Sequence, residues 1–228
     1  MKLSKRLQAV ADLVDDDLVV ADVGTDHGYI PIYLIETGKC KKVFAMDVNE
    51  GPLQKAKEHV IENQMCEQIE LRLSDGVKAL KKDECDAVIL AGMGGGLVIR
   101  ILEDGQHIRD NIKTWILQPQ SEIQKVRKYL IDNQYQIVDE DIVEEDGKYY
   151  PMMKVINGLS EEYHDIELRY GKILLQKKSP ILLQFLDKEI RTKEQILNNL
   201  EVTEQAQERR YALRQEIAEA RAAYLRCL

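Results

Sequence analysis

The chain contains no long apolar segment. Its longest unbroken apolar runs, such as Ala87–Ala91, are far too short to cross a bilayer. The first residues, Met1–Val14, include three basic side chains and reach Asp12 before any long apolar stretch. This pattern is typical of an amphipathic helix and not of a signal peptide. We therefore expect a cytoplasmic protein without a membrane anchor.

Clusters of cysteine and histidine are also missing. None of the four cysteines forms a Cys-x-x-Cys pair, and the four histidines are equally dispersed. We expect reduced thiols and neither disulfides nor a metal site. The residues concerned are Cys40, Cys66, Cys85, Cys227, His27, His59, His107 and His164.

An excess of basic charge is absent too. The net charge of −8 argues against a protein that coats nucleic acid nonspecifically. Residues 159–228 hold 12 basic and 12 acidic side chains, whereas residues 1–158 hold 20 and 28. Of the 13 glycines, only Gly171 lies beyond Gly158. With 44% hydrophobic residues the chain can bury a real core, and we predict two domains, 1–158 and 159–228.

In the first domain short apolar runs alternate with amphipathic stretches. Several of the runs are continuously apolar, which indicates strands buried on both faces of a parallel, doubly wound α/β sheet. The expected strands are Leu18–Val23, Lys42–Asp47, Ile69–Leu73, Ala87–Ala91 and Thr114–Gln118. The expected helices are Ile30–Glu36, Gly51–Asn63, Gly76–Leu80, Gly95–Leu102 and Glu122–Asn133.

The domain ends differently, in two strand-like runs with no room for a helix between them. Gln136–Val143 and Tyr150–Ile156 flank the turn Glu144–Gly147, which predicts an antiparallel hairpin. Five α/β units closed by a hairpin strand outline the class I, Rossmann-like methyltransferase sheet. Plain dinucleotide-binding folds lack that closing hairpin.

The last third of the chain is predicted to be helical. Pro180 is well placed at a helix start, and apolar residues then recur in steps of three and four, with Lys193 in one of the apolar positions. Thr203 can cap a second helix with the same spacing. Two such helices joined by Asn198–Thr203 predict an antiparallel coiled-coil hairpin.

The strongest motif follows the first predicted strand and includes Asp22, Gly24, Asp26 and Gly28. It lacks the third glycine of Gly-x-Gly-x-x-Gly, which usually admits a pyrophosphate at the helix N-terminus. A carboxylate such as that of Asp26 would repel a pyrophosphate but would favour a cation. S-adenosylmethionine carries both a sulfonium and an ammonium group. The structural alternative is an ordinary strand–helix turn in which Asp26 or Thr25 caps the helix.

Two more acid-bearing turns follow the next strands. Asp47 lies about 20 residues after the glycine loop, where an acid accepts hydrogen bonds from ribose hydroxyls. Asp75 follows the third strand and could receive the adenine amino group of the same ligand. Each could instead cap a loop or helix. Three successive acidic turns at the carboxyl edge of the sheet favour one shared ligand.

Loops after the fourth and fifth strands complete this edge. Four glycines within Gly92–Gly96 let the backbone approach two bound molecules closely. The Asp/Asn-Pro-Pro-aromatic sequence that enzymes methylating exocyclic amino groups often carry here is absent. Gln118 and Gln120 offer neutral donors and acceptors, and Ser121 is expected to cap the next helix.

Together these motifs resemble one family closely. Gly24–Pro31, Ala91–Gly95 and Leu117–Gln120 are similar to the corresponding segments of the TrmK family, the bacterial tRNA adenine-N1 methyltransferases that act at tRNA position 22. The resemblance covers nearly the whole chain. It implies a class I methyltransferase domain, S-adenosylmethionine as the methyl donor, tRNA as the partner and a C-terminal coiled-coil domain that helps to hold tRNA.

The site expected from the motifs and the resemblance has three groups of residues. Asp26 is the candidate catalytic residue, which would hydrogen-bond the adenine amino group and stabilise the cationic product. The candidate cofactor residues are Asp22, Gly24, Thr25, His27, Gly28, Asp47, Val48, Asp75, Gly76, Ala91 and Gly92. The candidate substrate residues are Lys5, Arg6, Tyr29, Met93, Gly94 and Gln118, and no metal is expected. Because position 22 lies in the helical D arm, the base would have to flip out.

Two other functions stay open at this point. A nicotinamide-dependent oxidoreductase is disfavoured by the missing third glycine and by the closing hairpin. A non-catalytic binding module would use the coiled-coil hairpin as its working part. The oligomeric state and the preferred tRNA species do not follow from the sequence.

Overall fold

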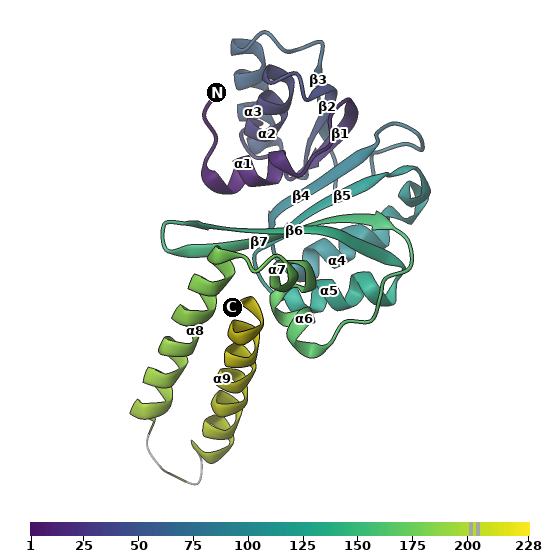
Figure 1. Ribbon diagram of the computed structural model, residues 1–228. Helices are drawn as coiled ribbons and strands as arrows, with labels where there is room; N and C mark the ends of the chain where they lie inside the picture. The colour runs from purple at the N-terminus through teal and green to yellow at the C-terminus, as the bar shows by residue number, and fades with distance from the viewer. Residues whose placement is uncertain (201–202, 204–205) are drawn as a thin grey trace. The chain divides into compact units, whose positions relative to one another are not determined.

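A computed structural model describes residues 1–200, 203 and 206–228 of the chain. Its internal contacts divide the chain into two units, Met1–Glu161 and Glu162–Leu228. Figure 1 colours the chain by residue number, from purple at the N-terminus to yellow at the C-terminus. The predicted domain boundary at residue 158 lies close to this division. In the described part of the chain, no helix is long and apolar enough to cross a membrane.

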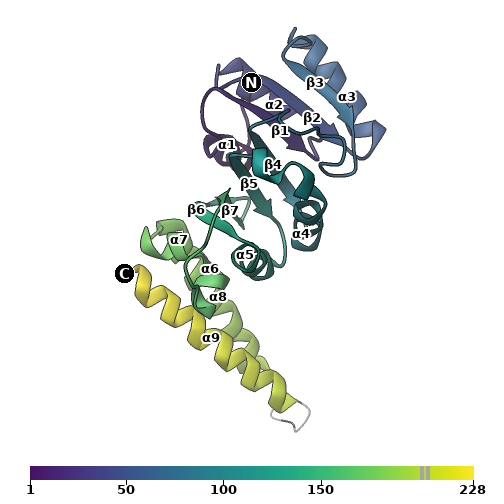
Figure 2. The same cartoon turned by 90° about the vertical axis from the view of Figure 1, so that its right-hand side faces the viewer.

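The first unit is built on one seven-stranded sheet with the order β3-β2-β1-β4-β5-β7-β6 (Figures 1 and 2). The first five strands along the chain are parallel, and β7 is antiparallel to β5 and to β6. This arrangement confirms the predicted Rossmann-like methyltransferase sheet with its closing hairpin. The strands are β1 Leu18–Val23, β2 Cys40–Asp47, β3 Ile69–Leu73, β4 Ala87–Met93, β5 Thr114–Pro119, β6 Tyr135–Glu145 and β7 Lys148–Asn157.

Helices accompany the parallel strands. They are α1 Lys5–Asp12, α2 Tyr29–Glu36, α3 Glu50–Glu62, α4 Gly95–Asp104 and α5 Ile123–Asp132, with short 3₁₀ turns at Gly105–His107 and Arg109–Asn111. The amphipathic pattern of the first residues does form a helix, α1, whose Ser4 hydroxyl accepts a hydrogen bond from Leu7 N. Ala9, Val10 and Ala11 of α1 are buried in a core cluster with strand residues such as Val20 and Ile89.

Two residues form the turn of the β6–β7 hairpin. Asp146 and Gly147 have φ values of 51° and 74°, the left-handed pair that a type I′ turn requires. The turn is therefore shorter than the predicted Glu144–Gly147, and the strands run to Glu145 and start again at Lys148. Figure 1 shows the hairpin extending past the end of β5.

The predicted helix Gly76–Leu80 is wrong, because these residues form a turn. Gly76 has a φ of +61°, which interrupts a right-handed helix at its first residue. The Ser74 hydroxyl donates to Gly76 O at 2.8 Å and accepts from Ala79 N at 3.1 Å. A local side-chain bond thus closes the segment in place of a helical ladder.

Charged and thiol side chains are buried in the first unit as well. Arg127 of α5 donates from Nε to Glu140 Oε1 of β6 at 2.8 Å, and both side chains are almost completely buried. Such a pair is costly to break, because either partner alone would leave a buried charge. Burial raises the pKa of the Cys40 thiol to about 11 and that of Cys85 to about 12. Cys66 is exposed.

The second unit is helical, as predicted. Its helices are α6 Asp165–Tyr170, α7 Lys172–Gln176, α8 Pro180–Asn199 and α9 Gln207–Cys227. Ser179 caps α8 by accepting from Leu182 N, and Pro180 is its first residue. The two long helices lie side by side in both views and run in opposite directions (Figures 1 and 2). Their supercoiling stays a prediction, and part of the predicted connection Asn198–Thr203 lies outside the described residues.

The pairing of Lys193 accounts for the interruption in the apolar pattern of α8. Its ammonium lies 2.5 Å from a Glu189 oxygen and 2.8 Å from a Glu216 oxygen of α9. Arg169 of α6 contacts Glu219 at 2.6 Å in the same unit. The two long helices are therefore held by charged pairs as well as by buried apolar residues, such as Leu186 of α8 and Leu213 of α9.

Candidate functional site

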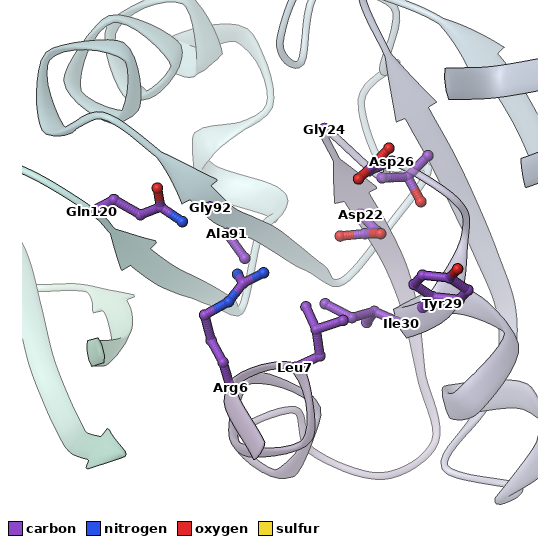
Figure 3. A pocket seen from close by; sticks show the side chains of 11 residues that line it. Arg6, Leu7, Asp22, Gly24, Asp26, Tyr29, Ile30, Ala91, Gly92 and Gln120 are labelled. Carbon is purple, nitrogen blue, oxygen red and sulfur yellow. The ribbon is translucent and has the colours of Figure 1, made fainter. Parts of the chain in front are cut away.

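A pocket of about 190 Å³ lies at the carboxyl ends of β1 and β4 (Figure 3). Three parts of the chain surround it: the start of α1, the segment from the end of β1 into α2, and the end of β4 together with Gln120 after β5. The lining residues are Arg6, Leu7, Asp22, Gly24, Thr25, Asp26, Tyr29, Ile30, Ala91, Gly92 and Gln120. The doubly wound topology thus places the pocket at the edge where such sheets bind ligands.

The turn after β1 is tied to the neighbouring strand. The backbone N–H groups of Gly24 and Thr25 both donate to Met46 O, at 2.8 and 2.9 Å. Gly24 has a φ of +75°, and a Cβ there would lie 2.5 Å from Met93 Cε. The backbone angle therefore favours glycine, whereas the flexible end of the Met93 side chain could move away from a Cβ.

Two carboxylates, Asp22 near the end of β1 and Asp26 in the turn after it, have different environments. Asp22 is 3% exposed, and burial raises the pKa of its carboxyl to about 7, an effect that the charge of Asp47 increases. Asp26 is 74% exposed at its side chain and has a φ of +34°, which is unusual for a residue other than glycine. A positively charged ligand in the pocket would therefore lie near two different acids, the buried Asp22 with its raised pKa and the exposed Asp26.

Arg6 brings a positive charge to the other side of the pocket. Its Nη1 donates to Gln118 Oε1 at 3.0 Å, and its guanidinium lies 5.7 Å from the centre of the Tyr150 ring. Figure 3 shows the side chain rising from α1 toward Ala91 and Gly92. Gln118 is completely buried and also accepts from Gly92 N at 3.2 Å. Its amide thus orients Arg6 and the glycine loop and does not line the pocket.

The glycine-rich segment that joins the end of β4 to α4 has two functions in the fold. Gly92 has a φ of +78° and faces the pocket. Gly95 begins α4, and a Cβ there would lie 2.5 Å from Ser121 O. Ser121 Oγ accepts from Gly95 N at 3.3 Å, so this hydroxyl joins two loops. The prediction that Ser121 caps α5 is wrong, because the residue before that helix is Glu122, with a left-handed backbone and no capping side chain.

Three aromatic rings stack beside the start of α2, and one of them, Tyr29, lines the pocket. The rings of His27, Tyr29 and His59 have centroids 5.3 to 5.9 Å apart and planes within 25° of each other. His59 Nδ1 lies 2.8 Å from His27 O and so fixes the turn to α3. Sequence reasoning missed His59, since no local motif marks a residue that lies 32 positions from its partner.

The acids at the end of β2 and after β3 lie outside the pocket lining. Asp47 is buried, and its Oδ1 accepts from Asn49 N at 2.8 Å. Asp75 is held by Lys78 Nζ at 2.6 Å and Arg100 Nη2 at 2.8 Å. The Lys78 ammonium, more than the Arg100 charge, keeps the pKa of Asp75 below its usual value. Each acid therefore already has the capping or pairing role that was the alternative to ligand binding.

The pocket thus brings together eight of the predicted site residues. Predicted residues that do not line it are Lys5, His27, Gly28, Asp47, Val48, Asp75, Gly76, Met93, Gly94 and Gln118, and their roles stay predictions. Leu7 and Ile30 were not predicted, because single apolar residues carry no chemical signal in a sequence. No group of three or more His, Cys, Asp or Glu side chains suited to a metal occurs among the described residues.

Comparisons with known proteins identify close relatives. The family model described as TrmK, tRNA (adenine(22)-N(1))-methyltransferase, matches residues 20–222. A curated tRNA (adenine(22)-N(1))-methyltransferase from Bacillus subtilis (strain 168) is 34% identical over 205 residues, which span 88% of this chain and 86% of that protein.

Solved structures agree with this relationship. The crystal structure of Streptococcus pneumoniae Sp1610, described as a putative tRNA (m1A22) methyltransferase, is 35% identical and matches with a TM-score of 0.92 over 98% of this chain and all of the other. The same protein in complex with S-adenosyl-L-methionine matches with a TM-score of 0.88 at equal identity and coverage.

Proposed function

The chain belongs to the TrmK family of tRNA (adenine(22)-N(1))-methyltransferases, and from this we propose that it transfers a methyl group from S-adenosylmethionine to N1 of adenine 22 in tRNA. The family match and the S-adenosyl-L-methionine complex of its relative support the reaction class. The observation that carries the proposal in this chain is the pocket, where Asp22 and Asp26 face the space that Arg6 enters.

The residues of the pocket suit the charges of S-adenosylmethionine. Asp22 and Asp26 would attract its ammonium and sulfonium groups, and Gly24 and Gly92 leave room for a ligand close to the backbone. A volume of about 190 Å³ accommodates only part of such a ligand. The adenosine part would continue over the ends of β2 and β3, past Asp47 and Asp75.

S-adenosylmethionine supplies the methyl group, which bonds to the adenine N1 lone pair as the carbon–sulfur bond breaks and its electron pair stays on sulfur. The role of the chain is then mostly to align the base and to place charge. Asp26 is exposed at the mouth of the pocket, where its carboxylate would accept a hydrogen bond from the adenine amino group. A negative charge there favours the cationic product.

The proposal places the protein in the cytoplasm, where tRNA is modified. No metal is part of it. The nicotinamide-dependent oxidoreductase and the non-catalytic module are not supported by the comparisons, which match methyltransferases over most of the chain.

Methyl transfer to a tRNA transcript tests the proposal. We expect labelled methyl from S-adenosylmethionine to appear in a tRNA with adenine at position 22 and not in the same tRNA with guanine there. Titration with NAD serves as the second arm. Binding of NAD without binding of S-adenosylmethionine, or equal labelling of both transcripts, would contradict the assignment.

A further inference from the structure

We propose that a second pocket beside the first binds a nucleotide that flanks the methylated adenine, with its base stacked on a tyrosine. This subsite rests on the proposed function and specifies how the RNA would enter. The pocket has a volume of about 500 Å³, within the range of small-molecule sites. It is lined by Pro119, Gln120, Ile123, Lys148, Tyr149, Tyr150 and Pro151.

The topology places this pocket on the same sheet edge as the first. Because β7 is antiparallel to β5, its first residues lie at the carboxyl end of the parallel strands. The register pairs Leu117 with Met153, and the pairing of β7 with β5 begins only at Met153, after residues 148–152. The hairpin therefore extends beyond β5 and leaves its first residues beside Pro119 and Gln120.

The two pockets are neighbours. Gln120 lines both of them. Arg6, which enters the first pocket, lies 5.7 Å over the ring of Tyr150, which lines the second. Lys5 also ties α1 to the hairpin, since its backbone N–H donates to Glu145 Oε1 at 2.6 Å. An RNA strand with its target adenine at the mouth of the first pocket, beside Asp26, would therefore meet the second pocket with an adjacent nucleotide.

The lining suits a nucleotide. Two tyrosines, two prolines and Ile123 offer apolar and aromatic surface. Any of the four bases can stack on an aromatic ring, because every base has a π-face. Lys148 is exposed at the rim, and Arg6 adds a second cation toward the first pocket. The nearby acid Glu144 accepts from Gly147 N at 2.7 Å, and Glu145 accepts from Lys5 N, so both acids are bonded to backbone. A nucleotide matches this lining, because its planar base can stack on the tyrosine rings and its phosphate can pair with Lys148 or Arg6.

The decisive variant is Tyr149→Leu, with Tyr149→Phe as its matched control. Tyr149 is chosen because a change at Tyr150 would disturb the contact of its ring with Arg6, which lines the first pocket. Removing the ring should raise KM for tRNA by about 5- to 100-fold with kcat unchanged, since stacking would stabilise bound substrate and transition state alike. The phenylalanine variant keeps a ring and should stay within about twofold of the wild type.

Lys148→Gln tests the cation, with Lys82→Gln as its control. Lys82 is also exposed, but it precedes β4 and so lies at the opposite edge of the sheet. Lys148→Gln should reduce the slope of log tRNA affinity against log salt concentration by about one, the value for one phosphate contact. Lys82→Gln should leave this slope unchanged. Equal slopes for the two variants would overturn the phosphate part of the subsite.

Affinity for S-adenosylmethionine and thermal unfolding are measured on the full-length form of every variant. An unchanged cofactor affinity in Tyr149→Leu, together with the raised KM, supports the subsite. A wild-type KM in that variant, an equal loss in Tyr149→Phe, or a parallel loss of cofactor affinity overturns it. Methylation of tRNA by the wild-type protein is read in the same experiment, so failure of the proposed reaction is distinguished from failure of the subsite.

Discussion

Asp26 combines an exposed carboxylate with a left-handed backbone, and asparagine tolerates that backbone well. Asp26→Asn should therefore change the free energy of unfolding by less than about 1 kcal/mol. If the charge supports the developing adenine cation, turnover at saturating substrates should fall by roughly two orders of magnitude. Single-turnover methylation and urea unfolding measure the two effects, and near-normal turnover would exclude the catalytic role.

If Asp22 binds the cofactor as proposed, we expect the affinity for S-adenosylmethionine to depend on pH. Its carboxyl has a pKa of about 7 in the folded chain, so it is mostly neutral at pH 6 and mostly ionised at pH 8. A cationic ligand favours the ionised form. The affinity for S-adenosylmethionine should therefore fall about tenfold from pH 8 to pH 6 relative to the affinity of Asp22→Asn. Calorimetry on both proteins checks this, because the ligand's own titration cancels in the comparison.

The same group has an opposite effect on folding. Its pKa is raised above the unfolded value, so the stability that its neutral form contributes is present at low pH and is lost as pH rises through about 7. The unfolding free energy of the wild type, relative to Asp22→Asn, should decrease from pH 6 to pH 8. Parallel curves for the two proteins would show that Asp22 does not titrate in this range.

Asp47 tests the part of the site that the first pocket does not include. If Asp47 accepts hydrogen bonds from the ribose hydroxyls as predicted, Asp47→Ala should cost about 1.5–3 kcal/mol of affinity for S-adenosylmethionine. Asp110→Ala is the control, because Asp110 is an exposed acid before the amino end of β5. A folded Asp47→Ala protein that binds the cofactor normally would refute the assignment.

Among the helices, the contact between the start of α4 and the turn before α5 depends on one glycine. A Cβ on Gly95 would lie 2.5 Å from the backbone oxygen of Ser121, so Gly95→Ala should destabilise the protein by about 1–3 kcal/mol. Gly51 lies in α3 with open space around it, and Gly51→Ala should be neutral or stabilising. Urea unfolding of the two variants would contradict this packing if both behaved alike.

Strands were predictable from the sequence because short continuous apolar runs, such as Leu18–Ala21, are typical of strands buried on both faces of a sheet. The errors arose where a side-chain hydrogen bond decided the local structure. Ser74 closes a turn in place of the predicted helix, and Ser121 bonds Gly95 instead of capping α5. The presence of His59 beside His27 depends on the packing of α3, which no local pattern encodes. Arg6 was expected near the substrate, but its support by the buried Gln118 emerges only in three dimensions.

For the whole chain, the two parts differ in net charge, since the acidic excess lies in residues 1–158 and residues 159–228 are balanced. The residues that the sequence favours for phosphate contact in the second unit are Lys172, Lys177, Lys178, Arg209, Arg210, Arg214 and Arg221. Some of them already have partners: Arg210 donates to Leu200 O at 2.7 Å, and Arg221 lies 2.5 Å from a Glu194 oxygen. Contact with tRNA by this unit stays a prediction.

Removal of the second unit provides the test. A chain of residues 1–161 retains the complete sheet and should still fold and bind S-adenosylmethionine. It should lose most of its tRNA affinity and methyl transfer. Measured across a salt series, equal affinities and slopes for the shortened and full-length chains would show that the helical hairpin has a structural or oligomerising role instead.

The different burial of the four thiols allows the unfolding of the chain to be followed by labelling its own cysteines. Cys66 is exposed, whereas Cys40 and Cys85 are buried in the first unit and Cys227 in the second. A pulse of maleimide on the native protein should therefore add one label rapidly. Partial denaturation that opens only the helical unit would add a second, and loss of the sheet would add two more. Mass spectrometry of the intact chain could then follow the unfolding of each unit without any engineered probe.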